Sequence, residues 1–360
     1  MSRPGGPSAV VVAWLAVGRA AIHSAAETAM TDPGRPDSEG GAPSSDATPD
    51  PAITRRALLG GAGATVLSAL GATTSLTAAS WNQAEPASAT VHVRVYPGPM
   101  PVTARLGAGR PDENGLFSVH RDALEAVEGA LEGALTYAGE RGVDLDAVVE
   151  PGGPVAASFF SRLETAVRER RNPSAQETVL DAFRDELRER EVLSGTTCHL
   201  LLWWNPFNYD LGYGGTRSPN GHVTAVDGEG SQTVANVGAT EFWDSRAVTR
   251  NIAIHETLHT FLSRDVVSEV VGSGCDHDLG SAIRREEGDE TVLEISPMAT
   301  AYAGPDEFGG GTRFHGTGCY DHDSFSRHDG TDDVDRFVYT TDLSEATLEA
   351  LTRYLERHLG

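Results

Sequence analysis

The stretch Ile252-Ala253-Ile254-His255-Glu256-Thr257-Leu258-His259-Thr260-Phe261 contains two histidines separated by three residues, with a glutamate directly after the first. In an α-helix, residues four apart lie one above the other on the same face. The imidazoles of His255 and His259 can therefore bind one metal ion together, and Glu256 projects beside them. Positions 252–262 carry no other charge, and their apolar residues include Ile252, Leu258, Phe261 and Leu262. This pattern predicts a buried helix that carries a metal site through a domain core.

The two histidines and the glutamate of this helix are the groups that hydrolysis at a zinc ion requires. The ion lowers the pKa of a bound water to about 7, and Glu256 can accept its proton and pass it to a leaving amine. The same short pattern also arises by chance, in which case His255 and His259 are only a pair of histidines in a core. The uncharged surroundings favour the zinc site, because an ordinary surface helix would carry charges there.

The composition indicates the environment in which the chain works. It has 52 acidic and 28 basic residues, a formal net charge of −24, and every basic residue is arginine. Such an acidic excess keeps a surface hydrated and suits concentrated salt, so we expect a halophilic protein. An acidic surface that attracts a cationic substrate is the alternative, although the acids are spread along the chain. The absence of a basic patch argues against a nucleic-acid partner.

The first 89 residues predict an export signal preceded by an extension. Thr54-Arg55-Arg56-Ala57-Leu58-Leu59 and the small, apolar run 60–79 are typical of a twin-arginine signal peptide over residues 54–89. Cleavage is expected after Ala89, with a site near Ala79 as the alternative. Its glycines make the apolar run a poor permanent membrane span. We therefore expect recognition by the twin-arginine translocase and an extracellular or cell-surface location.

Residues 1–53 are expected to form a disordered N-terminal extension, because the segment from Pro33 to Pro51 is rich in Pro, Gly, Ser and Asp. Met30 lies close upstream of the two arginines and is an alternative initiator to Met1.

The mature chain predicts an α+β fold. Hydrophobic patterns indicate strands at 90–96, 143–149 and 198–204, helices at 119–141, 174–191 and 344–358, and a hairpin that pairs 222–226 with 233–237. We expect a mixed sheet over the metal-binding helix in an N-terminal subdomain, residues 90–262, and a smaller C-terminal subdomain, residues 263–360. An edge strand from the hairpin could hold an extended peptide by main-chain hydrogen bonds.

The motif resembles the zincin peptidases and, among them, the metzincins. Their pattern is His-Glu-x-x-His-x-x-Gly-x-x-His or Asp, followed by a tight turn that contains methionine. His255, Glu256 and His259 match its first half, whereas Leu262 stands at the glycine position and Asp265 at the position of the third ligand. The resemblance implies a zinc ion with three protein ligands and an α+β fold.

The third ligand does not follow directly from the metzincin pattern. Leu262 allows the helix to continue toward Gly272, which would turn Asp265 about 100° away from the histidine face. We therefore expect His277 to be the third ligand, with Asp276 or Asp278 orienting its imidazole. Asp265 remains an alternative and His322 a reserve, and a glutamate ligand, as in the gluzincin branch, would come from Glu286, Glu287, Glu290 or Glu294.

The methionine turn is expected at Met298, which follows the metal-binding helix in the sequence. The resemblance implies that Met298 forms a hydrophobic base under the metal and that a following tyrosine, here Tyr302, stabilises the oxyanion. A core methionine and a structural tyrosine are the alternatives.

The cysteines allow one disulfide. Three are present, and outside the cell Cys275 and Cys319 are the preferred pair, with Cys198 in an apolar run as a buried thiol.

The sequence thus predicts an exported zinc metalloprotease that cuts peptide or protein substrates. A zinc hydrolase of another amide or ester and a non-catalytic, zinc-stabilised surface-binding protein are the alternatives.

Overall fold

A computed structural model of the chain describes 90–155, 175–194, 196–206, 208, 211–216, 231–299 and 324–359. All of these residues belong to one compact unit, Ser80–Gly360. The predicted extension and signal peptide lie outside them. None of the helices in the described ranges is long and apolar enough to span a membrane.

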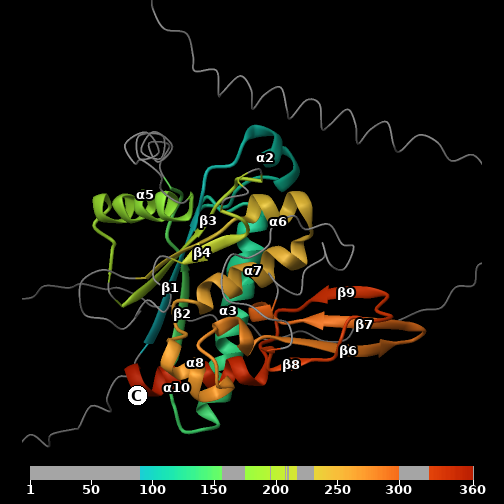
Figure 1. Cartoon of the computed structure of the whole chain (residues 1–360). Helices are drawn as coiled ribbons and strands as arrows, with labels where there is room; N and C mark the ends of the chain where they lie inside the picture. The colour runs from blue at the N-terminus through green and yellow to red at the C-terminus, as the bar shows by residue number, and fades with distance from the viewer. Residues whose placement is uncertain are drawn as a thin grey trace, which may run out of the picture. The chain divides into compact units, whose positions relative to one another are not determined.

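A five-stranded sheet forms the centre of this unit (Figure 1). Its strands follow the order β2 (Asp146–Pro151), β1 (Thr90–Pro97), β3 (Thr197–Leu202), β5 (Ser231–Ala235) and β4 (Gly214–Thr216). All neighbours are parallel except β4, which runs antiparallel to β5 at the edge. The strands predicted at 90–96 and 198–204 are confirmed, and the one predicted at 143–149 begins and ends slightly later. Both faces of β3 are buried, as its apolar run predicts.

Side chains that alternate along the strands divide the core into two clusters. Val93 and Val95 of β1 pack on one face with α3 (Ser118–Gly139) and α7 (Arg246–Leu258). Tyr96 points to the other face, where α5 (Ala175–Glu189) packs. The sequence patterns at 119–141 and 174–191 therefore predicted these helices correctly, because each buries one apolar stripe on the sheet.

The hairpin predicted from residues 222–226 and 233–237 can be followed only in its second strand, which corresponds to β5. Residues 222–226 lie outside the described residues, and β5 pairs with β3 and β4 instead. Val237, expected at the end of that strand, begins the short helix α6 (Val237–Trp243), which Asn236 caps by accepting from the Ala239 N–H at 3.3 Å.

The metal-binding helix is shorter than predicted. The expectation that it continues through Leu262 is wrong, because α7 ends at Leu258 and a separate helix, α8 (Arg264–Val271), follows. Between them the chain tightens into a turn in which the Phe261 N–H donates to the Leu258 carbonyl at 2.9 Å. The turn lets both Phe261 and Leu262 enter the core, where neither is exposed. Burying these two side chains contributes more free energy than continuing the helix would.

Beyond α8, the chain builds a second sheet that the sequence analysis did not predict. Its strands follow the order β8 (Arg327–His328), β6 (Ser281–Glu287), β7 (Glu290–Ile295) and β9 (Arg336–Tyr339). The last helix, α10 (Glu345–Leu359), matches the prediction for 344–358. Leu351 and Leu355 of α10 join the cluster that also contains Val93, so residues on both sides of the predicted boundary after Leu262 share one core.

Candidate metal centre

The end of α7 brings two imidazoles together. His255 lies in the last helical turn and His259 is the C-terminal cap residue. Their ring centroids are 4.5 Å apart, and their Nε2 atoms are separated by 2.9 Å. The helical spacing of four residues therefore directs both rings to one point, as the sequence predicted.

A third imidazole reaches the same point from the short 3-10 helix η1 (Asp276–Leu279), which follows α8. The ring of His277 stacks on that of His255, with centroids 5.1 Å apart and an interplanar angle of 13°. One possible ligand atom from each of His255, His259 and His277 lies within 4.8 Å of the other two. The break between α7 and α8, followed by Gly272 in the left-handed conformation, turns the chain back to place His277 there.

The Nδ1 atoms of the two helical histidines are held by acceptors. Nδ1 of His255 donates to the carbonyl of Pro297 at 2.7 Å, in the 3-10 helix η2 (Pro297–Ala299). Nδ1 of His259 donates to Oδ2 of Asp276 at 2.7 Å. Of the two carboxylates predicted to orient His277, Asp276 binds His259 and lies 3.9 Å from Nδ1 of His277, and Asp278 accepts from the hydroxyl of Ser273.

The electrostatics of the cluster favour one shared cation. Burial lowers the pKa of His255 well below its usual range, and the imidazoles of His259 and His277 lower it further. Burial also opposes a charge on His259, but the carboxylate of Asp276 outweighs it and raises the pKa of His259 to about 9. Despite burial, His259 in turn holds the pKa of Asp276 below its usual range.

This arrangement fits a metal ion. With both Nδ1 atoms donating, the two Nε2 atoms lie 2.9 Å apart, and a proton or a metal ion must lie between them because two lone pairs at this distance would repel each other. Two nitrogen ligands of a tetrahedral zinc ion would be about 3.3 Å apart, given bonds of roughly 2.0–2.1 Å. The buried histidines could therefore hold a metal ion.

Glu256 lies beside the histidines and is 4% exposed. Its Oε2 atom accepts from the hydroxyls of Thr216 on β4 and Thr233 on β5, each at 3.4 Å. Burial raises the pKa of Glu256 to about 7, although His259 and the two hydroxyls act in the opposite direction. A carboxylate with a pKa near neutrality can accept and return a proton.

Comparisons with known proteins add no family to this description. No protein-family model matches the sequence, and no curated protein matches it either. The chemistry of the centre is therefore inferred from its own residues.

Met298 is fully buried in the main core cluster, directly after the residue whose carbonyl holds His255. Tyr302, the predicted oxyanion residue, lies outside the described residues, as do His322 and Cys319. Cys275 is disulfide-bonded, whereas Cys198 is a free, buried thiol. The pairing of Cys275 with Cys319 stays a prediction.

The alternative ligands lie elsewhere. Asp265 is on the surface of α8, where its side chain is 72% exposed and pairs with Arg357 at 3.3 Å. The four glutamates considered as ligands lie on the β6–β7 hairpin, away from the imidazoles, and three of them pair with arginines of the same sheet: Glu287, Glu290 and Glu294.

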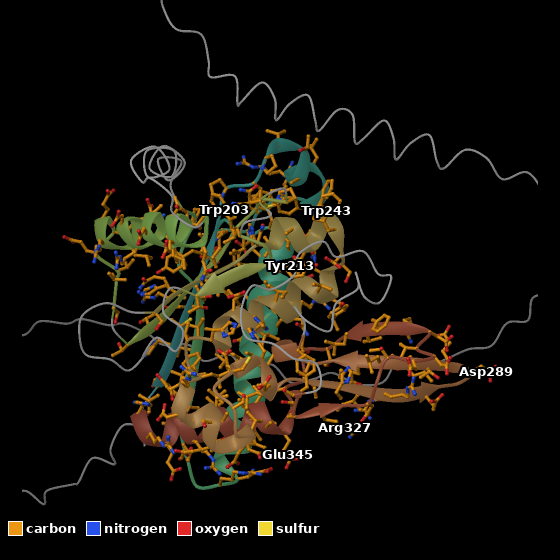
Figure 2. The ribbon with its side chains drawn as sticks, viewed as in Figure 1. Trp203, Tyr213, Trp243, Asp289, Arg327 and Glu345 are labelled. Atoms are coloured by element: carbon orange, nitrogen blue, oxygen red, sulfur yellow. The ribbon has the colours of Figure 1, made fainter. Side chains whose placement is uncertain are left out.

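Sequence reasoning missed the residues that support the centre. Thr216, Thr233 and Pro297 carry no pattern that marks them, since each meets the motif only through the fold. Asp276 was noticed for its place beside His277, but its contact with His259 depends on the turn at η1. Tyr213, labelled in Figure 2, directly precedes β4 and donates through its hydroxyl to Asp244, which ties the edge strand to the α6–α7 corner.

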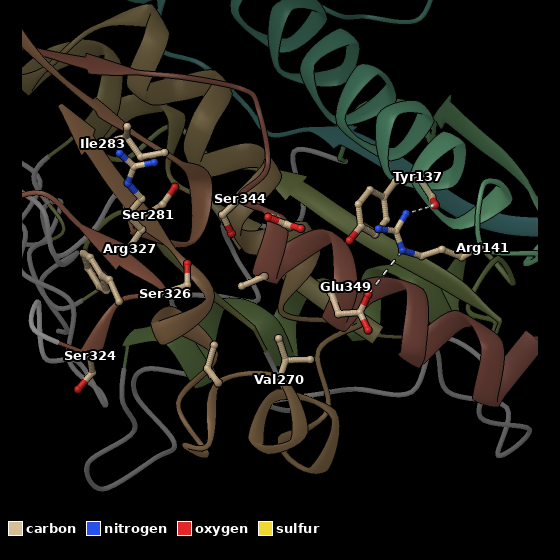
Figure 3. A pocket seen from close by; sticks show the side chains of 14 residues that line it. Tyr137, Arg141, Val270, Ser281, Ile283, Ser324, Ser326, Arg327, Ser344 and Glu349 are labelled. Atoms are coloured by element: carbon tan, nitrogen blue, oxygen red, sulfur yellow. Dashed lines mark hydrogen bonds and ion pairs between the residues drawn. The ribbon is translucent and has the colours of Figure 1, made fainter. Parts of the chain in front are cut away.

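A separate hollow of about 790 Å³ lies between α10, α8 and β6 (Figure 3). Its lining includes Arg141, which pairs with Glu349 at 3.7 Å and stacks over the ring of Tyr137. No histidine is among its described lining residues, and Arg141, Arg327 and Glu349 each form an ion pair. The groups capable of metal chemistry are therefore at the end of α7.

Proposed function

We propose that the protein is an exported, zinc-dependent endopeptidase of metzincin-like build. The observation that carries the proposal is the meeting of three imidazoles, two of them with Nε2 atoms 2.9 Å apart, beside a buried glutamate. Three protein ligands and an adjacent base are typical of catalytic zinc, whereas structural zinc sites usually have four ligands.

In this proposal His255, His259 and His277 hold the zinc ion. Bound there, the ion would act as a Lewis acid toward a substrate carbonyl and lower the pKa of water. The Pro297 carbonyl and the Asp276 carboxylate fix the orientation of two of the rings, and outer acceptors of this kind also strengthen an imidazole as a ligand.

Glu256 is the proposed general base and acid. It would take the proton of the attacking water and deliver it to the nitrogen of the leaving amine, with no covalent enzyme intermediate. Its pKa of about 7 suits both transfers near neutral pH. Peptide hydrolysis needs this relay, because an amine is a poor leaving group until it is protonated.

The edge strand β4 is the proposed binding site for an extended peptide. In the antiparallel pair of β4 and β5, the main-chain groups of Gly214 and Thr216 face away from β5. The carbonyl of Thr216 accepts from Gln176 at 2.9 Å, so Gly214 is the position of this short strand best placed to pair with substrate. β4 also lies against Glu256, which would bring the peptide to the base.

The rest of the proposal comes from the sequence. A metzincin-like build would place Met298 under the metal as a hydrophobic base. The twin-arginine motif supports export to the cell surface or the medium, and the acidic composition supports function in concentrated salt without a nucleic-acid partner.

Metal analysis and a hydrolysis assay test the proposal together. The purified protein is expected to hold one zinc ion per chain and to cleave casein or a peptide library in high salt. Glu256→Gln should reduce turnover by about 10²–10⁴-fold and leave zinc bound. Glu186→Gln is the matched control, because Glu186 on α5 is about equally buried and pairs with Arg190, directly after the helix.

The same experiment separates the alternatives. Cleavage of small amides or esters without cleavage of peptides would assign the protein to another class of zinc hydrolase. Bound zinc with no hydrolysis of any substrate would favour a zinc-stabilised binding protein. A protein that binds no metal under any condition would remove the proposal.

A further inference from the structure

Two threonine hydroxyls meet the carboxylate of Glu256 from neighbouring strands. Thr216 lies on β4 and Thr233 lies opposite it on β5, and their Oγ1 atoms are 2.9 Å apart. Each Oγ1 also lies 3.4 Å from Oε2 of Glu256. We call these residues the threonine pair. Both are buried, Thr233 completely.

Proton counting shows what the threonine pair can do. Each hydroxyl has one proton, and the two atoms are close enough that one donates to the other. The hydroxyl that accepts within the pair then has its own proton to donate to Oε2. In either direction, one proton remains for the contact with Oε2 at 3.4 Å, and the alternative acceptors are the carbonyl oxygens of Gly215 and Glu256, each 3.3 Å from one of the two hydroxyls.

The other side of the carboxylate is confined by the backbone of β4. A Cβ atom at Gly214 would lie 2.6 Å from Oε1 of Glu256 and 2.2 Å from the carbonyl oxygen of Val234. Only glycine therefore allows the carboxylate to lie against this strand. Together with the threonine pair, Gly214 leaves Glu256 little freedom to rotate.

We propose that Thr216 and Thr233 are positioning residues that hold Oε2 of Glu256 and leave Oε1 to exchange the proton with water and the leaving amine. The inference rests on the proposed peptidase function and adds a specific role for the edge strand. Because the same strand would bind the peptide, the threonine pair fixes the distance between the bound substrate and the base.

Steady-state kinetics of Thr233→Val test this role. The variant keeps the side-chain shape but loses the hydroxyl, and kcat is expected to fall by about 10–100-fold, with KM and zinc content unchanged. Thr216→Val should act in the same direction. Thr233→Ser, which restores the hydroxyl, should recover most of the lost kcat.

Thr240→Val is the matched control. Thr240 and Thr249 form another fully buried hydroxyl pair, with Oγ1 atoms 2.7 Å apart, that does not touch Glu256. This variant should lose comparable stability and keep the wild-type kcat. Equal kcat values for Thr233→Val and Thr240→Val would overturn the role of the threonine pair.

A measurement without catalysis keeps the two proposals separate. Thermal unfolding of the metal-free protein is compared for Thr233→Val, Glu256→Ala and the double variant, and the changes in Tm are expected not to add, because the side chains contact each other. Additive changes would overturn the contact itself. A wild-type protein that hydrolyses nothing, yet shows non-additive changes, would overturn the peptidase function and the kinetic role while leaving the contact established.

Discussion

Buried histidines occur in two settings in this protein, and their Nδ1 atoms behave differently. His120 on α3 and His199 on β3 are isolated from other imidazoles and have no exposed surface. Nδ1 of His120 accepts from the Phe117 N–H at 3.3 Å, and Nδ1 of His199 shares a hydrogen bond with the Tyr96 hydroxyl at 3.1 Å. Because Nδ1 of His120 accepts, its Nε2 carries the proton and cannot bind a metal.

In the candidate metal centre the direction is reversed. Nδ1 of His255 donates to the Pro297 carbonyl and Nδ1 of His259 donates to Asp276. The Nε2 atoms are the remaining ring nitrogens, and they converge to 2.9 Å. The comparison teaches that the partner of Nδ1, more than burial, distinguishes a structural histidine from a possible metal ligand.

Among the pKa values, that of His259 stands apart, because burial lowers the pKa of His255 as well. Burial lowers the pKa of His120 and of His199 to about 4, so both stay neutral in the folded protein. The side chain of His259 is only 13% exposed, yet the adjacent carboxylate of Asp276 raises its pKa to about 9. The carboxylate of Asp276 therefore reverses the direction in which burial alone would shift the pKa of His259.

The largest change in zinc affinity is expected for His277→Ala. Loss of one of three ligands should weaken zinc binding by at least about 100-fold, since even outer partners contribute 10–100-fold. His199→Asn, which changes a histidine of the other setting, should leave the affinity unchanged. Competition with a chromogenic chelator measures both zinc affinities. Equal affinities in the two variants would contradict the assignment of His277 as a metal ligand.

A smaller loss of zinc affinity, about 10–100-fold, is expected for Asp276→Asn, because the amide weakens the hold on Nδ1 of His259. The control is Asp329→Asn, which alters a carboxylate that pairs with Arg327 on the second sheet. Isothermal titration with zinc compares them. If both variants bind like the wild type, Asp276 has no part in orienting the ligand.

The lowered pKa of His120 leads us to expect that the free energy of unfolding depends on pH. His120 has a pKa of about 4 when folded and about 6.5 when unfolded, so the unfolded chain binds the proton first. The contribution of neutral His120 is complete above pH 6.5 and is lost as the pH falls toward about 4. Urea unfolding of the metal-free protein should show this loss. In His120→Asn, the slope of the unfolding free energy against pH should be smaller by an amount that corresponds to at most one proton. An unchanged slope would contradict the assignment.

The smallest effect is expected for Asp265→Asn. Its side chain is 72% exposed and pairs only with surface arginine in the described structure, so zinc affinity should not change. Loss of an exposed ion pair should shift Tm by less than about 2 °C. A marked loss of zinc would restore Asp265 as the third ligand and would require the end of α7 to rearrange.

Local patterns predicted much of the fold. Alternating residues at 90–96 and the helical spacing at 119–141 correspond to β1 and α3, because each pattern repeats with the period of the element that it forms. The second sheet was not predicted. Its strands carry many charges, such as those at 284–287, and its order joins β8 and β9 to a hairpin that precedes them by many residues.

The break after Leu258 shows where local reasoning fails. Nothing between Leu258 and Arg264 is a glycine or a proline, so sequence favoured a continuous helix. The helix ends because Phe261 and Leu262 are buried in a core assembled partly by α10, at the other end of the chain. That information is absent from the segment itself.

By itself, the sequence determined that His255 and His259 share one helical face with Glu256 beside them, since four-residue spacing in a helix is a local property. Tertiary structure alone brought His277 to the same point, set the direction of the Nδ1 hydrogen bonds through Pro297 and Asp276, and enclosed Glu256 beneath the hydroxyls of two strands. These contacts join segments that no periodicity relates. They follow from where the chain turns to bury its apolar side chains.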